Sequence, residues 1–242
     1  MPASAVCGIL FFMIQFPHME TKKERVQIFV DGGNFYHLVL KKLGISENDF
    51  SLDDFAKFLA NGRDIVNMGK RFYVGTVREQ VGNPRSIKAM SKQTKHFTTL
   101  KSTGWDIKTS KLRMRTERIR IDSRVVNYEE LKRKGVHKIE IRTTREKGID
   151  VKLATDLVVG AVDDRYDTAI IVSSDSDLIP AIDWVRKKRN KKIEYIGFSI
   201  MDKKDERNNT RPLQTMIGYT DIQRILAESD MKKFIKVQEK LI

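Results

Sequence analysis

Two short apolar runs, Val26–Val30 (VQIFV) and Thr168–Val172 (TAIIV), constrain the fold of this chain more than any other feature. Each run leads into aspartate, at Asp31 and Asp175. The second run is apolar throughout, which is typical of a strand buried on both faces of a parallel sheet. Helical patterns alternate with such runs along the chain. This alternation predicts an α/β fold, with helices on both faces of a mostly parallel sheet.

The hydrophobic periodicity gives the approximate positions of the elements. Strands are expected at 26–30, 71–77, 105–114, 138–142, 168–172 and 192–198. Helices are expected at 35–43, 53–59, 84–100, 150–162, 177–188 and 221–238. Glycines fall where the first and third helices should end, at Gly44 and Gly104, and Pro84 falls where the third should begin.

The length of 242 residues suits one α/β domain with additions. We expect the domain over residues 26–200, with a Lys- and Arg-rich insertion over 113–147 and a C-terminal helical extension over 201–242. Residues 1–25 form an N-terminal extension, and the native start is expected at Met19. The apolar run at 5–16 is too short to span a bilayer and lacks the basic start of a secretory signal. These features predict a cytoplasmic protein.

The charge of the chain is strongly segregated. The net charge is +14, and residues 61–147 contain 23 Lys and Arg against nine Asp and Glu. Residues 148–185 contain eight Asp and two basic residues. This pattern predicts a surface for a polyanion beside a carboxylate cluster. The candidate phosphate contacts are Lys88, Lys92 and Lys95, which share a helix face, and Arg113, Arg115, Arg118 and Arg120. A solvated helix face and a charged strand edge would explain the same residues.

Four aspartates are expected at one end of the sheet, because ligands bind beyond the carboxyl ends of parallel strands. They are Asp31, Asp150, Asp175 and Asp177. Carboxylates so close together repel one another, and Mg²⁺ or Mn²⁺ would relieve that repulsion. Each aspartate alone could instead cap a helix. Gly32 and Gly33 are expected to let the chain turn tightly after Asp31.

Other polar residues are expected to support this cluster or to lie apart from it. Asn34 and Ser173 are candidate groups that orient a carboxylate, although turn chemistry explains them as well. Asp156 is a weaker candidate, because six residues of helix place it on a different face from Asp150. Asp163, Asp164 and Asp167 are expected to be solvated in a polar loop.

Several other chemistries are excluded by what the sequence lacks. A single cysteine rules out a disulfide framework and a Cys-based zinc site. The strand before Asp31 is followed by no dinucleotide-binding glycine pattern, and no Walker A lysine motif is present. The serines at 173, 174 and 176 have no histidine near them in sequence for nucleophilic catalysis.

Three motifs, VDGGN at 30–34, KGID at 147–150 and VSSDSDL at 172–178, together resemble the signature of the NYN domain family, in its LabA-like branch. That family belongs to the PIN-like superfamily of metal-dependent ribonucleases. The resemblance implies a Rossmann-like, three-layer α/β/α fold with an acidic pocket for Mg²⁺ or Mn²⁺. Asp31, Asp150, Asp175 and Asp177 match the metal-binding aspartates, and Asn34 matches the asparagine after the first of them. Ser174 stands where the family commonly has glycine.

The resulting hypothesis is a metal-dependent nuclease that hydrolyses phosphodiester bonds, with the resemblance favouring RNA as substrate. The first alternative is an RNA-binding or regulatory module that keeps the fold without activity. A haloacid-dehalogenase-type phosphatase needs a second aspartate where this chain has Gly33. A topoisomerase-primase-type site would need a glutamate after the first strand, and none is evident. A homodimer is left open, and no membrane partner is expected.

Overall fold

The computed structural model describes residues 23–76, 84–111, 113–145, 148–202 and 205–236. Their centre is a six-stranded sheet in the order β3-β2-β1-β6-β7-β8, and every neighbouring pair of strands is parallel. The strands are β1 (Arg25–Asp31), β2 (Asp64–Thr76), β3 (Asp106–Lys111), β6 (Thr168–Val172), β7 (Lys192–Ser199) and β8 (Ile222–Ala227). The predicted α/β fold is confirmed.

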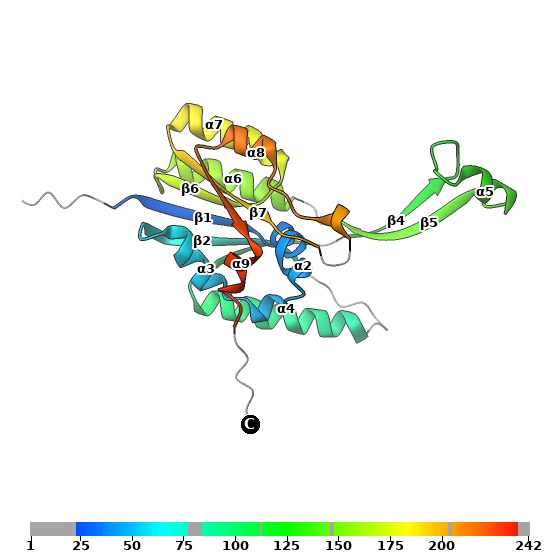
Figure 1. Ribbon diagram of the computed structural model, residues 1–242, viewed down its shortest axis with the longest axis horizontal. Coiled ribbons are helices and arrows are strands. Elements are labelled where there is room, and N and C mark those ends of the chain that lie inside the picture. The colour runs from blue at the N-terminus through cyan, green and yellow to red at the C-terminus, as the bar shows by residue number, and fades with distance from the viewer. Residues whose placement is uncertain (1–22, 77–83, 112, 146–147, 203–204, 237–242) are drawn as a thin grey trace, which may run out of the picture.

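Helices cover both faces of this sheet (Figure 1). One face carries α1 (Gly32–Phe35), a π-helical turn (Tyr36–Leu40), α2 (Lys41–Leu43), α3 (Leu52–Ala60), α4 (Pro84–Ser102) and α9 (Glu228–Lys232). The other face carries α6 (Ile149–Val162), α7 (Ile179–Arg189) and α8 (Gln214–Tyr219). Short 3₁₀ turns lie at Glu47–Asp49, Ser176–Leu178 and Glu206–Asn208.

The central strands are largely apolar because they contribute to two hydrophobic cores. In β1, Ile28 and Val30 belong to the core on one face, and Phe29 belongs to the core on the other. Successive side chains of a strand point to opposite faces, so a strand covered on both sides needs apolar residues at every position. In β6 all five residues are buried, as its sequence predicted.

The C-terminal part of the chain corrects one expectation. The prediction of a helix at 221–238 is wrong, because Ile222–Ala227 forms strand β8. This strand pairs with β7 at the edge of the sheet. Among the described residues that follow it, up to residue 236, the one helix is the five-residue α9. The extension after residue 200 is therefore partly sheet rather than helical. Among the described residues, no helix has the length and apolar character needed to cross a membrane.

The basic insertion forms a separate structure, which we call the arm. It consists of β4 (Arg113–Arg120), α5 (Tyr128–Arg133) and β5 (Lys138–Arg145), and its two strands pair antiparallel as a sheet of their own. The arm projects from the body of the protein (Figure 1). The single strand expected at 105–114 is thus two strands, β3 and the start of β4. Residues 1–22, which include the expected start at Met19, and Val77 and residues 146–147 lie outside the described residues.

The order of the strands fixes where a site can form. From β1 the chain moves outward to β2 and β3, and from β6 it moves outward in the opposite direction to β7 and β8. The strands β1 and β6 are neighbours, so the strand order reverses between them. In open parallel sheets a crevice opens at this reversal, outside the carboxyl ends of the strands.

Candidate metal centre

Three aspartates meet at the carboxyl edge of β1 and β6. Asp31 is the last residue of β1, Asp175 follows β6, and Asp150 lies in the first turn of α6. One carboxylate oxygen from each lies within 4.8 Å of the others. Asp31 is buried, Asp175 is half-buried and Asp150 is exposed, so the group opens towards solvent.

The donor set fits a hard divalent cation. Mg²⁺ takes oxygen ligands at about 2.1 Å in octahedral geometry, which places neighbouring ligand oxygens roughly 3 to 4 Å apart. The three carboxylate oxygens are within 4.8 Å of one another, so small side-chain movements would bring them to that spacing. The remaining positions would be open to water and to a substrate oxygen.

The two strand-end aspartates are held by local hydrogen bonds. Asp31 caps helix α1, because its Oδ1 accepts a hydrogen bond from the Asn34 backbone N–H at 2.9 Å. Asp175 Oδ1 accepts one from the Asp177 backbone N–H at 2.9 Å. The capping role considered from the sequence is therefore present at both positions. It uses one oxygen of each carboxylate and orients the side chain.

Ser173 and Asn34 connect the two strand ends. The buried Ser173 Oγ donates to Asp31 Oδ2 at 3.3 Å and accepts from the Asp175 backbone N–H at 3.2 Å. Asn34 Oδ1 accepts from the Ser174 backbone N–H at 3.0 Å. These bonds fix the end of β1 relative to the loop after β6, and with it the spacing of Asp31 and Asp175.

Gly32 is needed for a reason other than the one expected. Neither Gly32 nor Gly33 adopts the left-handed conformation that only glycine favours. A Cβ atom at Gly32 would instead lie 2.4 Å from the ring of Phe72 on β2. The absent side chain lets α1 begin directly against the core, immediately after Asp31.

Asp177 stands beside the three-aspartate group. It is exposed, and it is not among the three residues whose oxygens converge. Its charge still acts on the group: burial raises the pKa of the Asp150 carboxyl, and the negative charges of Asp175 and Asp177 raise it further. The structure therefore gathers three of the four predicted aspartates and places the fourth within electrostatic range.

Asp156 has a different environment. Its Oδ2 accepts a hydrogen bond from the Tyr73 hydroxyl at 2.8 Å and lies 3.1 Å from Arg71 Nη1. Arg71 and Tyr73 are both on β2, so Asp156 anchors α6 to the sheet. Asp156 is outside the converging group but holds the helix that carries Asp150.

The predicted phosphate contacts lie on two separate elements. Lys88, Lys92 and Lys95 are exposed on α4, and Arg115, Arg118 and Arg120 are exposed on β4 in the arm. The side chain of Arg113 is outside the described residues. Helix α4 covers one face of the sheet and the arm projects beyond it (Figure 1), so these cations are carried by two different parts of the molecule.

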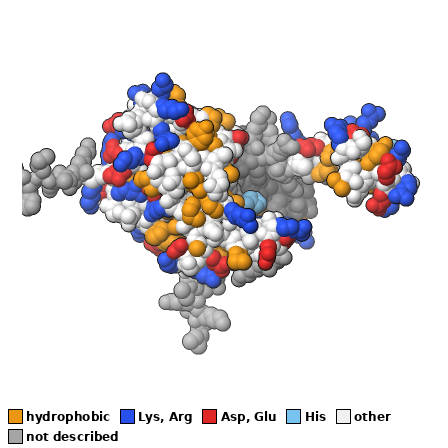
Figure 2. Space-filling model, turned by 45° about the horizontal axis from the view of Figure 1, so that its top comes forward, with side chains coloured by type: hydrophobic (Ala, Val, Ile, Leu, Met, Phe, Trp, Pro, Cys, Tyr) orange, Lys and Arg blue, Asp and Glu red, His pale blue; other side chains and the backbone are white. Residues whose placement is uncertain are grey.

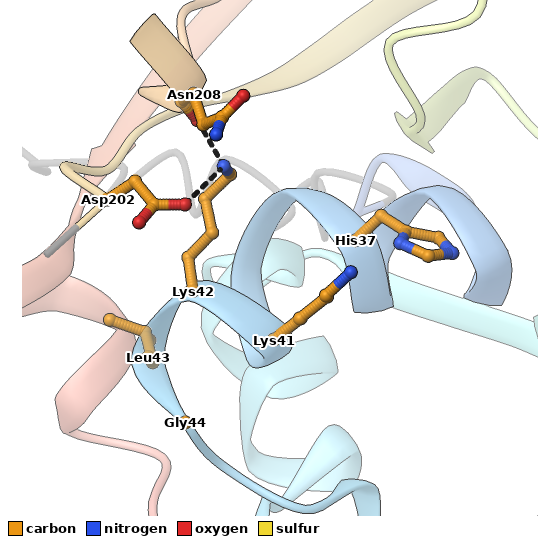
Figure 3. A pocket seen from close by; sticks show the side chains of 7 residues that line it. All are labelled: His37, Lys41, Lys42, Leu43, Gly44, Asp202 and Asn208. Atoms are coloured by element: carbon orange, nitrogen blue, oxygen red, sulfur yellow. Dashed lines mark hydrogen bonds and ion pairs between the residues drawn. The ribbon is translucent and has the colours of Figure 1, made fainter. Parts of the chain in front are cut away.

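A cavity of about 650 Å³ lies between the first helical segment and the loop after β7, and its residues were not anticipated from the sequence. Figure 3 shows Lys42 of the first helical segment pointing towards Asp202 and Asn208 of the loop after β7, while His37 and Lys41, which also line the cavity, point away from them. Lys42 Nζ lies 3.3 Å from Asp202 Oδ2 and donates to the Asn208 carbonyl. Asn34, which contacts the loop after β6, is one helical turn before His37. No sequence motif marks this cavity, because its walls are 160 residues apart in the chain.

This fold and its acidic edge define a three-layer α/β protein with a candidate cation site. The chain matches the NYN domain over residues 25–215, and it belongs to the NYN domain family, which is part of the PIN-like superfamily. A crystal structure of a protein of unknown function from Vibrio parahaemolyticus is similar, at 18% identity and a TM-score of 0.49. The similarity covers 85% of this chain and 94% of that one. A comparison with curated proteins finds no match. Assignment to the LabA-like branch stays a prediction.

Proposed function

We propose that this protein is a metal-dependent nuclease that hydrolyses phosphodiester bonds of RNA. The observation that carries the proposal is the convergence of Asp31, Asp150 and Asp175 from three separate elements at the point where the strand order reverses. Membership of the NYN family, and through it of the PIN-like superfamily, supports nuclease activity and a divalent metal. The family also directs the choice of RNA over DNA.

The three aspartates differ in burial, and their proposed roles in binding the ion differ accordingly. Asp31 and Asp175 would hold the ion from the two strand ends, with Ser173 and Asn34 keeping them in register. The exposed Asp150 would complete the site from α6 and leave one side open to the substrate. A bound Mg²⁺ or Mn²⁺ would activate water and stabilise negative charge on the scissile phosphate and the leaving oxygen. Asp177 would act as an additional carboxylate beside these three.

The basic residues of α4 and of the arm supply the attraction for a polyanion. Lys88, Lys92 and Lys95 are exposed on α4, and they could contact phosphates in the way that sequence-independent nucleic-acid binding requires. The alternative of an inactive RNA-binding module uses the same basic surface. The retention of all four aspartates, three of them in contact range of one ion, favours the enzyme.

The test is cleavage of end-labelled single-stranded RNA by the purified protein with Mn²⁺ or Mg²⁺. EDTA should stop cleavage, and Asp175→Asn should abolish it. A matched control is Asp163→Asn, since Asp163 lies in the exposed loop after α6 and pairs with Arg165. RNA that is bound but left intact with either metal, or cut equally well by Asp175→Asn, would support the binding module instead.

A further inference from the structure

The arm leaves the protein at the edge that holds the acidic group. Strand β3 ends at Lys111 on the carboxyl edge of the sheet, and β4 begins two residues later. Strand β5 ends at Arg145, five residues before Asp150. The arm is therefore continuous in sequence with the helix that supplies one of the three aspartates, and it extends outward from their edge (Figure 1).

The two faces of the arm differ in character. Ile119 lies opposite Ile139, and Ile141, opposite Glu117, falls on the same face. Each of these isoleucines is 37% to 40% exposed. Cross-strand apolar pairs of this kind stabilise a two-stranded ribbon, which is marginal in water without them. The isoleucines therefore have a structural explanation, and they leave the other face for contacts with a partner.

In the outer half of the arm, residues 117–120 and 138–141, the cations lie on the other face, whereas Arg115 nearer the base lies on the isoleucine face. That other face carries Arg118 opposite Glu140, with an ion pair of 2.9 Å, and Arg120 opposite Lys138. Lys138 has no ion-pair partner among the described residues. Residues 113–145 contain eleven Lys and Arg against five Asp and Glu. Figure 2 shows Lys and Arg side chains gathered around the far end of the arm, at the right of the view. A second copy of so basic an arm would be repelled, whereas a polyanion would be attracted.

The form of the polyanion follows from the shape and the composition of the arm. Binding of single strands relies on aromatic side chains on which bases stack. Tyr128 is the one Phe, Tyr or Trp among residues 113–145, which also contain His137, and Lys132 Nζ lies 5.4 Å from the centroid of the Tyr128 ring. A stiff ribbon whose outer half carries its cations on one face suits the regular phosphates of a double helix. Duplex RNA offers a wide, shallow minor groove that is recognised by shape and backbone contacts.

We propose that the arm binds a double-helical segment of the RNA substrate, which extends away from the cleavage site along the face of Arg118, Arg120 and Lys138. The proposal rests on the proposed function. A strand of eight residues spans about 25 Å, so Arg120 and Lys138 lie that far from the base of the arm. At about 3.4 Å per pair in B-form DNA, and less in the A-form of RNA, that length corresponds to at least about seven base pairs. An RNA of a few nucleotides would fit the acidic group without reaching this pair.

The experiment compares three RNAs that share the same five-nucleotide single-stranded sequence. The first is this sequence alone, the second attaches it to a hairpin stem of twelve base pairs, and the third attaches it to an unpaired tract of equal length. Binding is measured in EDTA, and cleavage is measured with Mn²⁺. The test variant is Arg120→Gln/Lys138→Gln, a pair of directly facing, exposed side chains. The control is Lys188→Gln/Lys192→Gln, which removes the same charge near the opposite edge of the sheet.

The test variant should bind the stem-bearing RNA about tenfold more weakly than wild type, and its salt slope should fall by about two. Its binding and cleavage of the five-nucleotide RNA should equal wild type, and the control should behave as wild type with all three RNAs. An equal loss on the unpaired tract would overturn the duplex assignment. If the test variant binds the stem-bearing RNA as well as wild type, or if the control loses as much affinity, the arm is not a specific contact for the stem. If no form cuts any RNA, the proposed function fails, while the binding comparison still decides the role of the arm.

Discussion

The two ends of strands β1 and β6 carry aspartates in opposite electrostatic settings. At the amino edge, Asp167 precedes β6 and lies 2.7 Å from the guanidinium of Arg25, the first residue of β1. Arg25 also pairs with Asp164 at 3.1 Å, and Lys191 pairs with Asp164 as well. These loop aspartates were expected to be solvated. Asp164 is exposed and Asp167 is half-buried, and both also form ion pairs that were not anticipated. At the carboxyl edge, Asp31, Asp150 and Asp175 face one another.

The pKa values of the two groups shift in opposite directions. Hydrogen bonds from Arg25 lower the pKa of Asp167 to about 2. Burial and the charges of Asp175 and Asp177 raise the pKa of Asp150. Cations from the chain itself neutralise the amino edge, and no ion pair among the described residues involves Asp150 or Asp175. The contrast shows that aspartates at strand ends are not in themselves a site: the carboxyl edge is the one that a bound cation would stabilise.

The largest expected effect is on catalytic activity, which should depend on an aspartate of the carboxyl edge and not on one of the amino edge. Asp175→Asn should lower kcat/KM for RNA about a thousandfold or more, since losing a charged metal ligand removes several kcal/mol of transition-state stabilisation. Asp167→Asn should leave kcat/KM within about twofold. Initial rates at saturating Mn²⁺ measure both. Equal losses in the two variants would mean that the carboxyl edge has no special role.

Binding of the metal should appear as thermal stabilisation. An ion that binds the folded state at about 100 times its Kd adds about 2.7 kcal/mol, which raises Tm by roughly 5 to 10 °C in a chain of this size. Differential scanning fluorimetry with and without Mn²⁺ measures the shift. Asp31→Asn should lose most of it, and Asp167→Asn should keep it. A shift of the same size in both variants would place the ion elsewhere.

Removing the hydroxyl that joins the two strand ends should have an intermediate effect. Ser173→Ala should weaken Mn²⁺ affinity or activity about 10- to 100-fold, because a group that orients metal ligands typically contributes that much. Titration of cleavage rate against Mn²⁺ measures it, and excess Mn²⁺ should recover part of the rate. Ser199→Ala, at the exposed end of β7, is the control and should titrate as wild type.

The smallest expected effect is on the free energy of unfolding, which should change in opposite directions when an aspartate is neutralised at one edge or the other. The folded-state pKa of Asp167 is below its unfolded value, so its contribution is present above about pH 4 and is lost as the pH falls towards 2. Asp167→Asn should cost about 1 kcal/mol at pH 7 after allowance for solvent screening, and the difference from wild type should shrink by pH 3. Urea unfolding at both pH values measures this. Asp150→Asn should shift metal-free stability in the opposite direction, since it removes a repelled charge. A loss of stability in both variants would contradict the comparison.

Most of the sheet was predictable because its strands are buried on both sides. Val26–Val30 is apolar except for the buried Gln27, and Thr168–Val172 is apolar after the buried Thr168. A helix with a polar face does not show that pattern. Strand β8 was not predictable in the same way. Its apolar residues at 222, 225 and 226 have helical spacing, and only Leu226 of the strand is buried. The pairing with β7 at the sheet edge decides its structure, and that contact is not visible in the local pattern.

The candidate site was predictable to the extent that it depends on strand ends. Asp31 and Asp175 follow strands that were recognised, and parallel strands place their carboxyl ends at one edge. The positions of the carboxylate oxygens, which separate Asp177 from the other three aspartates, do not follow from strand ends alone. Helix geometry alone was enough to place Asp156 on a different face from Asp150. Its hydrogen bond to Tyr73 depends on tertiary packing and could not be predicted.

The ring of Phe72 beneath Gly32 ties the position of the acidic edge to the composition of the core. Any side chain at residue 32 must displace that ring or lift the start of α1, and Asp31 would move with the helix that it caps. Residues 32 and 72 are therefore a coupled pair: a substitution at one is compatible with the fold when the other changes in compensation. Across related chains, we expect a residue larger than glycine at 32 to occur with a smaller side chain at 72, and a double-mutant cycle between the two positions should be strongly non-additive.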